Sequence, residues 1–306
     1  MPIDRKTFIS KVALGSGGLM LGPPAVQTGN RPGFTIPADF SIRYLATRWG
    51  YRGTLDHYCQ AASEAGYDGI EEWLPGSQAE QEQLFRVAEN HGLEVGLLVG
   101  SGSQDFNEHL EQFRQDIDRA AALNPLYINC HSGRDYFTFE QNRQLIDYTT
   151  RVQAASGVRI SHETHRSRML FAAHITRQFL DELPELRLTL DISHWCTVHE
   201  SLLQDQPEAV SLALERTDHI HARVGHRQGP QVTDPGAPEW EREVAAHFGW
   251  WDRVVEQKIS EGGRITVLTE FGPPAYMPTV PFTGMPLADQ WQINTGMMNL
   301  WKERYR

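Results

Sequence analysis

The sequence predicts a single (β/α)8 barrel. Short β-like runs alternate strictly with longer helical runs from residue 40 onward. Parallel neighbouring strands need a crossover connection, which is usually a helix, so this alternation indicates a parallel sheet. There are eight such pairs of runs, and eight close most naturally into a barrel. No G-x-G-x-x-G turn, which would favour a doubly wound open sheet, follows any of the runs.

The β-like runs are short and rich in apolar residues, and each helical run repeats its apolar or small residues at helical spacing. The predicted strands are residues 40–45, 68–73, 93–99, 126–131, 158–163, 187–191, 218–221 and 264–270. The predicted helices are residues 55–65, 79–91, 106–123, 139–155, 170–182, 207–216, 239–261 and 287–305. Gly92 stands where a C-cap glycine would close the second helix.

The amino-acid composition makes nucleic-acid binding and membrane binding poor hypotheses for the function. A chain of 306 residues with 40% hydrophobic residues can bury the core of one large domain. The formal net charge of -11 gives no electrostatic reason to bind nucleic acid or anionic membranes. The three cysteines are scattered and form no C-x-x-C pair, so we interpret them as packing residues.

Residues 1–30 differ from the rest of the chain and resemble a signal. A basic segment containing Arg5-Lys6 precedes a short apolar run at 12–21, which is too short to span a bilayer but suits the apolar part of a signal peptide. The pattern is similar to a twin-arginine export signal with Lys in the second position, which predicts an exported, periplasmic protein. A disordered leader or short amphipathic helix on a cytoplasmic protein is the alternative. No other segment is long and apolar enough to cross a membrane.

Four consecutive strand ends carry side chains that can bind a metal, namely Glu163, Asp191, His221 and Glu270. In barrels of this kind the groups that carry the chemistry lie at the carboxyl ends of the strands. Three carboxylates at one point repel one another unless a cation neutralises them. An oxygen-rich set with one imidazole suits Mn2+, Mg2+ or Co2+, with Zn2+ as an alternative. A lone acid at a strand end is more often solvated or a helix cap, and Asp191 alone fits an N-cap.

The order of these residues resembles the xylose-isomerase-like TIM-barrel superfamily, in its sugar isomerase/epimerase branch. The shared pattern is Glu, then Asp-x-x-His, then His, then Glu after runs five to eight, and the resemblance covers residues 38–306. In the ketose 3-epimerases of that group the four matching positions hold a divalent metal, typically Mn2+. The resemblance implies that Glu163 and Glu270 are ligands and acid/base groups, and that Asp191 and His221 are ligands. It also implies that His194 and Arg223 contact substrate oxygens, although the epimerases have a longer interval before their arginine.

Residues at or near the ends of other predicted strands are candidates to line a substrate pocket. We predict contacts from His131 after the fourth run, His165 after the fifth, Glu71 in the second and Trp49 after the first. Each also has a structural interpretation, as a core histidine, a surface residue or a packing tryptophan.

Two further histidines are excluded from the predicted ligand set. His162 is expected on the opposite side of its strand from Glu163. His219 is likewise expected to pack on the opposite side of its strand from His221.

The residue types favour proton abstraction beside a carbonyl, with a metal stabilising the enediolate and a carboxylate as base. The leading hypothesis is therefore a metal-dependent sugar isomerase or epimerase. The resemblance also implies a homodimer, because barrels of this family often pair. A lyase or hydrolase of keto-sugars would use the same groups. A sugar-binding barrel without catalysis would not need two flanking glutamates. An AP-endonuclease-like phosphodiesterase needs an Asp-x-His pair after run seven, which Asp234-Pro-Gly236 does not provide.

Overall fold

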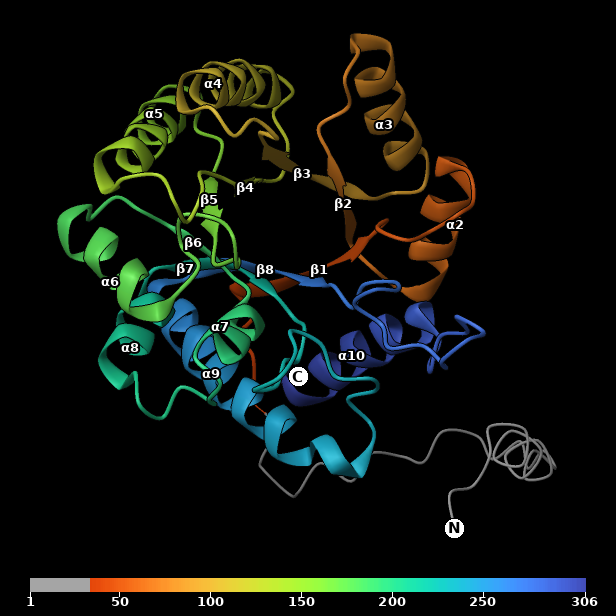
Figure 1. Cartoon of the computed structure of the whole chain (residues 1–306). Coiled ribbons are helices and arrows are strands. Elements are labelled where there is room, and N and C mark those ends of the chain that lie inside the picture. Colours follow the sequence, from red (N-terminus) through yellow and green to blue (C-terminus); the bar gives the residue numbers. More distant parts are fainter. Residues whose placement is uncertain (1–33) are drawn as a thin grey trace, which may run out of the picture.

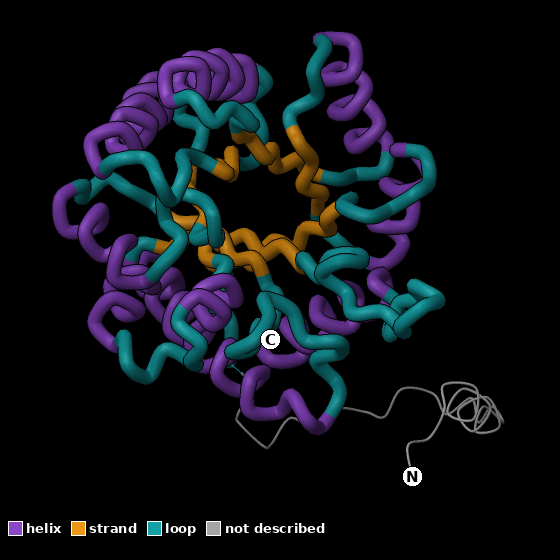
Figure 2. The backbone as a smooth tube through the Cα atoms, viewed as in Figure 1, coloured by secondary structure: helices purple, strands orange, loops and turns teal. Residues whose placement is uncertain are grey.

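The computed structural model describes residues 34–306, and in them eight parallel strands close into a barrel in chain order. Helices surround the ring of strands in the view down its axis (Figures 1 and 2). Closure is made by β1 (Phe40–Thr47), which pairs with both β2 (Gly69–Trp73) and β8 (Gly263–Thr269). The predicted (β/α)8 fold is confirmed. The export signal predicted for residues 1–30 lies outside the described residues.

The remaining strands follow the predicted order. They are β3 (Glu94–Gly100), β4 (Ile128–His131), β5 (Ile160–Glu163), β6 (Leu188–Leu190) and β7 (Thr217–His221). The helices are α2 (Leu55–Ala65), α3 (Gln78–Asn90), α4 (Phe106–Ala122), α5 (Phe139–Ser156), α6 (Ala173–Glu182), α7 (Ile192–Val198), α8 (Pro207–Glu215), the 3-10 turn η1 (Pro238–Trp240), α9 (Glu241–Glu261) and α10 (Gln290–Arg304). None of the helices in this part of the chain is long and apolar enough to cross a membrane.

Local sequence signals explain where several helices begin. Ser77 and Thr138 each form a capping box, in which the hydroxyl accepts from the third helical N–H and that residue's side chain accepts from the cap N–H. The short helix α7 was not predicted. It begins directly after Asp191, whose carboxylate accepts a hydrogen bond from the Ser193 N–H at 3.1 Å. The N-cap interpretation of Asp191 is therefore correct, and the strand before it is shorter than expected.

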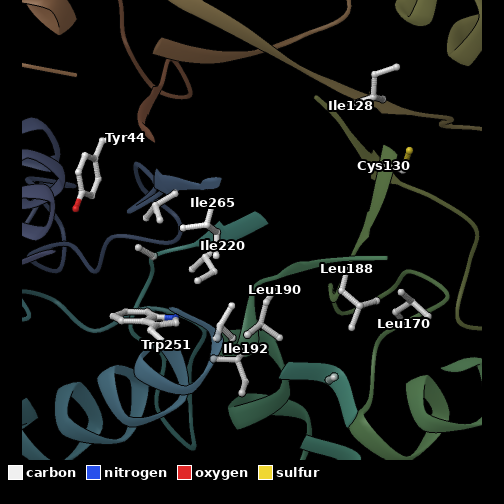
Figure 3. Packing of buried hydrophobic residues seen from close by; sticks show 14 of the residues in the cluster. Tyr44, Ile128, Cys130, Leu170, Leu188, Leu190, Ile192, Ile220, Trp251 and Ile265 are labelled. Carbon is white, nitrogen blue, oxygen red and sulfur yellow. The ribbon is translucent and has the colours of Figure 1, made fainter. Parts of the chain in front are cut away.

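The main hydrophobic core lies between the strands and the helices. Ile220 of β7 and Val267 of β8 are paired and fully buried, and both belong to the same cluster as Trp251 of α9. Figure 3 shows Trp251 together with labelled residues of β6, β7 and β8 in this cluster. Burial of a large aromatic or aliphatic side chain contributes about 1.5–3 kcal/mol, so this layer holds the helices against the barrel.

The interior of the barrel is much more polar than this outer layer. Only Leu45, Tyr127 and Leu268 form a separate small apolar cluster. Gly96 makes room for Tyr127, because a Cβ atom at that position would lie 2.5 Å from the tyrosine ring. Polar side chains therefore have space to meet inside the carboxyl-terminal half of the barrel.

Candidate active site

Four strand ends bring Glu163, Asp191, His221 and Glu270 together. One ligand atom from each lies within 4.8 Å of the corresponding atoms of the other three, and all four residues are buried. Glu163 is the last residue of β5 and His221 the last of β7, while Asp191 and Glu270 directly follow β6 and β8. Carboxyl ends of parallel strands share one edge of the barrel, which is why residues so far apart in sequence converge.

The shortest contacts fix the orientation of the imidazole. His221 Nδ1 lies 3.0 Å from Glu270 Oε2 and 3.6 Å from Glu163 Oε1. The opposite nitrogen, Nε2, lies 3.2 Å from Asn129 Nδ2 and 3.7 Å from a carboxylate oxygen of Glu71. Nδ1 is therefore the nitrogen that faces the other three side chains of the group.

The pKa shifts in this cluster show that its carboxylates have too little positive charge beside them. Burial raises the pKa of Asp191 to about 6, helped by the charges of Glu270 and Glu163 and opposed by Arg223. Burial would lower the pKa of His221, but the surrounding carboxylates raise it well above its usual value. Glu163 Oε1 is buried and accepts no hydrogen bond. A buried carboxylate oxygen without a donor and three neighbouring acids fit a divalent cation.

Arg223 is already engaged with two of the acids. Its guanidinium Nη2 donates to Asp191 and lies 3.4 Å from Glu270 Oε2. The same nitrogen is 2.9 Å from His194 Nε2, and the Arg223 side chain is 1% exposed. Arg223 therefore has a structural role, because the guanidinium partly balances the charge of Asp191, and its contact with a substrate stays a prediction.

A row of three histidine rings borders the four residues. His131 Nε2 lies 2.7 Å from Glu163 Oε2, and the His165 ring lies between His131, at 4.7 Å, and His194, at 3.9 Å. His131, Glu163 and His165 form a second group whose ligand atoms are within reach of one ion. Burial holds the pKa of both His165 and His194 well below the usual value. Burial thus favours the neutral form of both rings, in which one ring nitrogen donates a hydrogen bond and the other accepts one.

The structure corrects the prediction for His219. Positions two apart on a strand point to the same face, so His219 lies inside the barrel with His221, and their ring centroids are 5.1 Å apart. His219 Nε2 is 3.6 Å from Glu71 Oε2, which also accepts a hydrogen bond from the Tyr127 hydroxyl at 2.9 Å. His162, in contrast, lies on the opposite side from Glu163, as predicted, between the hydroxyls of Ser132 and Thr149 at 2.6 and 2.8 Å.

A cavity of about 400 Å³ opens above these residues, within the size range of small-molecule sites. Five predicted site residues line it, namely Trp49, Glu71, His131, His165 and Arg223, together with Glu270. His194 is fully buried and does not line it, so its contact with a substrate is not supported by this geometry.

Tyr276 and Arg168 also line the cavity, and neither was predicted from the sequence as a site residue. Tyr276 packs edge-on against Trp49 at 4.8 Å, and the Arg223 guanidinium lies 4.9 Å from its ring centre. The Gly- and Pro-rich segment after β8 was the available signal for Tyr276. Arg168 carries no local signal, because an arginine in a loop is ordinarily solvated.

Comparison with known proteins agrees with this architecture. Residues 59–242, more than half of the 306-residue chain, match the family model described as xylose isomerase-like TIM barrel. A search of curated protein sequences finds no match.

Several solved structures are similar in fold. A D-allulose 3-epimerase from Methylomonas sp. aligns with a TM-score of 0.57 and 17% identity, over 89% of this chain and 100% of the other. A 3-keto-D-glucoside 4-epimerase from E. coli gives 0.55 and 13%, over 86% and 100%. A probable 3-DHS dehydratase from Bacillus anthracis gives 0.55 and 16%, over 86% and 99%. At these identities the likeness shows the fold alone.

Proposed function

The chain belongs to the xylose isomerase-like TIM-barrel family, and we propose that it is a divalent-metal-dependent sugar isomerase or epimerase. The observation that carries the proposal is the convergence of Glu163, Asp191, His221 and Glu270 beside a cavity that Glu270 also lines. Epimerases among proteins of similar fold support it. A binding module would not require two glutamates beside the same ion site.

The four residues would hold the cation through three carboxylates and His221 Nδ1. This donor set suits Mn2+ best, with Mg2+, Co2+ and Zn2+ as alternatives. A divalent cation supplies Lewis-acid stabilisation of negative charge that develops on a substrate oxygen when a proton leaves the neighbouring carbon.

Glu163 and Glu270 are the proposed acid/base pair. They approach His221 Nδ1 from two strands, and a carboxylate within reach of the acidic carbon can take its proton. If the two glutamates lie on opposite faces of the bound sugar, one removes the proton and the other returns it, which inverts the carbon. The His131 ring, 2.7 Å from Glu163, is placed to hold that carboxylate in a single orientation.

The rest of the cavity would orient the sugar. Trp49 and Tyr276 present aromatic surface, and Trp73 lies edge-on to His131 at 5.4 Å. Aromatic rings suit the apolar faces of sugars, while His165 and Arg223 suit the hydroxyls. Water excluded by a bound sugar strengthens these charge interactions.

The test is solvent-deuterium exchange into a panel of ketoses, aldoses and 3-keto sugars, with purified protein that has been analysed for metal. Deuterium uptake into a sugar of unchanged composition supports isomerisation or epimerisation. Loss of a leaving group from the sugar would instead assign a lyase. Absence of exchange together with tight sugar binding would assign a sugar-binding barrel.

Glu270→Gln is the matched variant for this test. It keeps the size of the side chain and removes its basicity, so we expect exchange to fall by about 10²–10⁴-fold or more. Circular dichroism and unfolding temperature check that the barrel is intact. Unchanged exchange in this variant would remove Glu270 from the mechanism.

Export through residues 1–30 and the formation of a homodimer are also proposals. Export through residues 1–30 is tested by fractionating cells that express the full chain and its Arg5→Gln, Lys6→Gln variant. A homodimer is tested by the mass of the purified protein in solution.

A further inference from the structure

Arg168 is the one arginine lining the cavity whose side chain has no partner in the described part of the chain. Its side chain makes no hydrogen bond or ion pair there, and its Nε atom is buried and unsatisfied. The other two arginines of the cavity are engaged. Arg48 lies 3.1 Å from Glu72, and Arg223 contacts Asp191 and Glu270. An unpaired guanidinium in such a place needs a reason, because a partly buried charge is costly unless it is paired.

The surroundings of Arg168 make its positive charge harder to keep. Burial lowers its pKa, and the neighbouring Arg134 lowers it further. The Arg134 guanidinium is turned away and donates to the backbone oxygen of Gly102 at 2.8 Å. No carboxylate of the described residues lies within ion-pair distance of Arg168, although Glu163 and Asp135 act on it from farther away.

From these observations we propose that the cavity takes a sugar acid, whose carboxylate pairs with Arg168 while the rest of the sugar reaches the four converging side chains. The inference rests on the proposed function, since it names the substrate class of the same cavity. A guanidinium can donate two parallel hydrogen bonds to a carboxylate, and such a pair is stronger in a partly buried site than in water.

A carboxylate suits this cavity better than a phosphate. Among the described residues that line the cavity, Arg168 is the one arginine without a partner, and the wall already contains the carboxylates of Glu71, Glu72 and Glu270. A phosphate monoester carries about 1.5 to 2 negative charges at pH 7, so a single arginine would leave part of that charge unbalanced. A carboxylate has one negative charge and a planar shape that matches one guanidinium.

The experiment is calorimetric titration of the full, metal-loaded protein with matched acid and neutral ligands. The pairs are glucuronate with glucose, galacturonate with galactose, and gluconate with glucitol, and glucose 6-phosphate is included as a dianion. We expect at least one acid to bind at least 10-fold more tightly than its neutral partner and than the sugar phosphate. Arg168→Gln should remove most of this preference, a loss of about 10- to 100-fold in acid affinity. The affinity for the neutral sugar should change little.

Arg166→Gln is the matched control. Arg166 has the same charge two residues earlier on the same loop, but it lies 5.1 Å above the Tyr276 ring and does not line the cavity. We expect this variant to lower acid affinity by less than about 3-fold, because only the long-range field is lost. Arg168→Lys should keep part of the preference, which separates the charge from a general loss of structure.

Three results would overturn the sugar-acid proposal. They are the absence of an acid preference in the unchanged protein, a preference that survives in Arg168→Gln, and a stronger preference for the phosphate. Because binding is measured without turnover, this outcome is independent of the exchange assay. An Arg168-dependent preference with no exchange would keep the sugar-acid site and reject the isomerase. Exchange on neutral sugars with no acid preference would keep the isomerase and reject the sugar-acid site.

Discussion

The two ends of this barrel handle charge in opposite ways. At the amino-terminal ends of the strands Asp68, Glu94 and Asp218 lie beside basic partners, and Asp218 contacts Arg187 at 2.8 Å and Lys258 at 2.7 Å. At the carboxyl-terminal ends, Glu163, Asp191, Glu270 and Glu71 are buried with only one arginine, Arg223, paired to any of them. The first arrangement pairs its charges within the chain, whereas the second is where we propose that a cation binds.

This difference separates stability from function within one fold. Paired charges at the amino-terminal end are satisfied by the chain and need nothing else. Unbalanced charges at the other end are of the kind found at functional sites, and under the proposed function an ion and a substrate would balance them. Perturbing the carboxyl-terminal end should therefore change binding and catalysis, and perturbing the amino-terminal end should change folding stability.

The largest effect is expected from metal removal. Dialysis against a chelator should reduce deuterium exchange to the background rate and lower the unfolding temperature, and Mn2+ should restore both. A cation present at 100 times its dissociation constant stabilises the folded state by about 2.7 kcal/mol. The measurement is scanning fluorimetry with and without Mn2+.

Variants at the two ends sharpen this test. Glu163→Gln should lose the metal-dependent rise in unfolding temperature, whereas Asp218→Asn should retain it. An equal rise in both variants would mean that the cation binds elsewhere.

A smaller effect is expected from Glu71→Gln. His221 presents Nδ1 to the other three side chains of the cluster, so its Nε2 carries the proton when Nδ1 binds a metal, and Glu71 is the carboxylate facing Nε2. The neighbouring His221 and His219 rings outweigh the effect of burial and lower the pKa of Glu71 to about 2. A carboxylate behind a metal-bound histidine orients the ring, and its loss typically lowers metal affinity about 10- to 100-fold. Competition with a fluorescent chelator measures this affinity.

Glu72→Gln is the control for that experiment. Glu72 is the adjacent residue on β2 and also lines the cavity, but its contact is Arg48. Metal affinity should stay within about 3-fold of the unchanged protein. Tyr127→Phe, which removes a hydrogen bond to Glu71, should give a loss smaller than Glu71→Gln. Equal losses in Glu71→Gln and Glu72→Gln would indicate only a change in net charge.

Asp218→Asn should affect stability and leave function unchanged. The substitution removes the carboxylate that Arg187 shares with Lys258, whose side chain is 8% exposed and keeps its contact with Glu261, at a cost of about 1–3 kcal/mol. Chemical denaturation gives the free energy of unfolding, and deuterium exchange should stay at the level of the unchanged protein. Glu94→Gln is the control, because the side chains of Glu94 and its partners Arg43 and Arg264 are 39%, 43% and 41% exposed, and pairs in contact with solvent contribute about 0–1 kcal/mol.

The smallest expected effect is the pH dependence of that difference. Burial would raise the pKa of Asp218, but Arg187 and Lys258 outweigh it and hold the pKa below its usual value. A lowered folded-state pKa adds stability above the unfolded value of about 4, and this stability is lost as the pH falls through the folded value. The difference in unfolding free energy between the unchanged protein and Asp218→Asn should therefore be constant from pH 7 to 5 and shrink below about 4. A difference that grows on acidification would contradict this assignment.

The sequence was sufficient for the fold and for the four converging residues because both depend on local order along the chain. The alternation of β-like and helical runs predicted the number of strands, and each of the four candidate ligands stands at the end of a predicted strand. The prediction for His219 was wrong because two-residue spacing places it on the same face as His221. The helix α7 was missed because it has only seven residues and begins directly after Asp191, with no loop between it and β6 to mark the change.

By itself the sequence determined that this chain forms a (β/α)8 barrel with an acid-rich cluster at one end. Only the tertiary structure decided how those groups are partnered: that Arg223 pairs with Asp191, that Glu71 lies behind His221, and that the Arg168 side chain has no partner within residues 34–306. These contacts join strands and loops far apart in sequence. They depend on how the barrel closes and on the space that residues such as Gly96 and Tyr127 leave inside it, and neither is encoded in the spacing of residues along one strand.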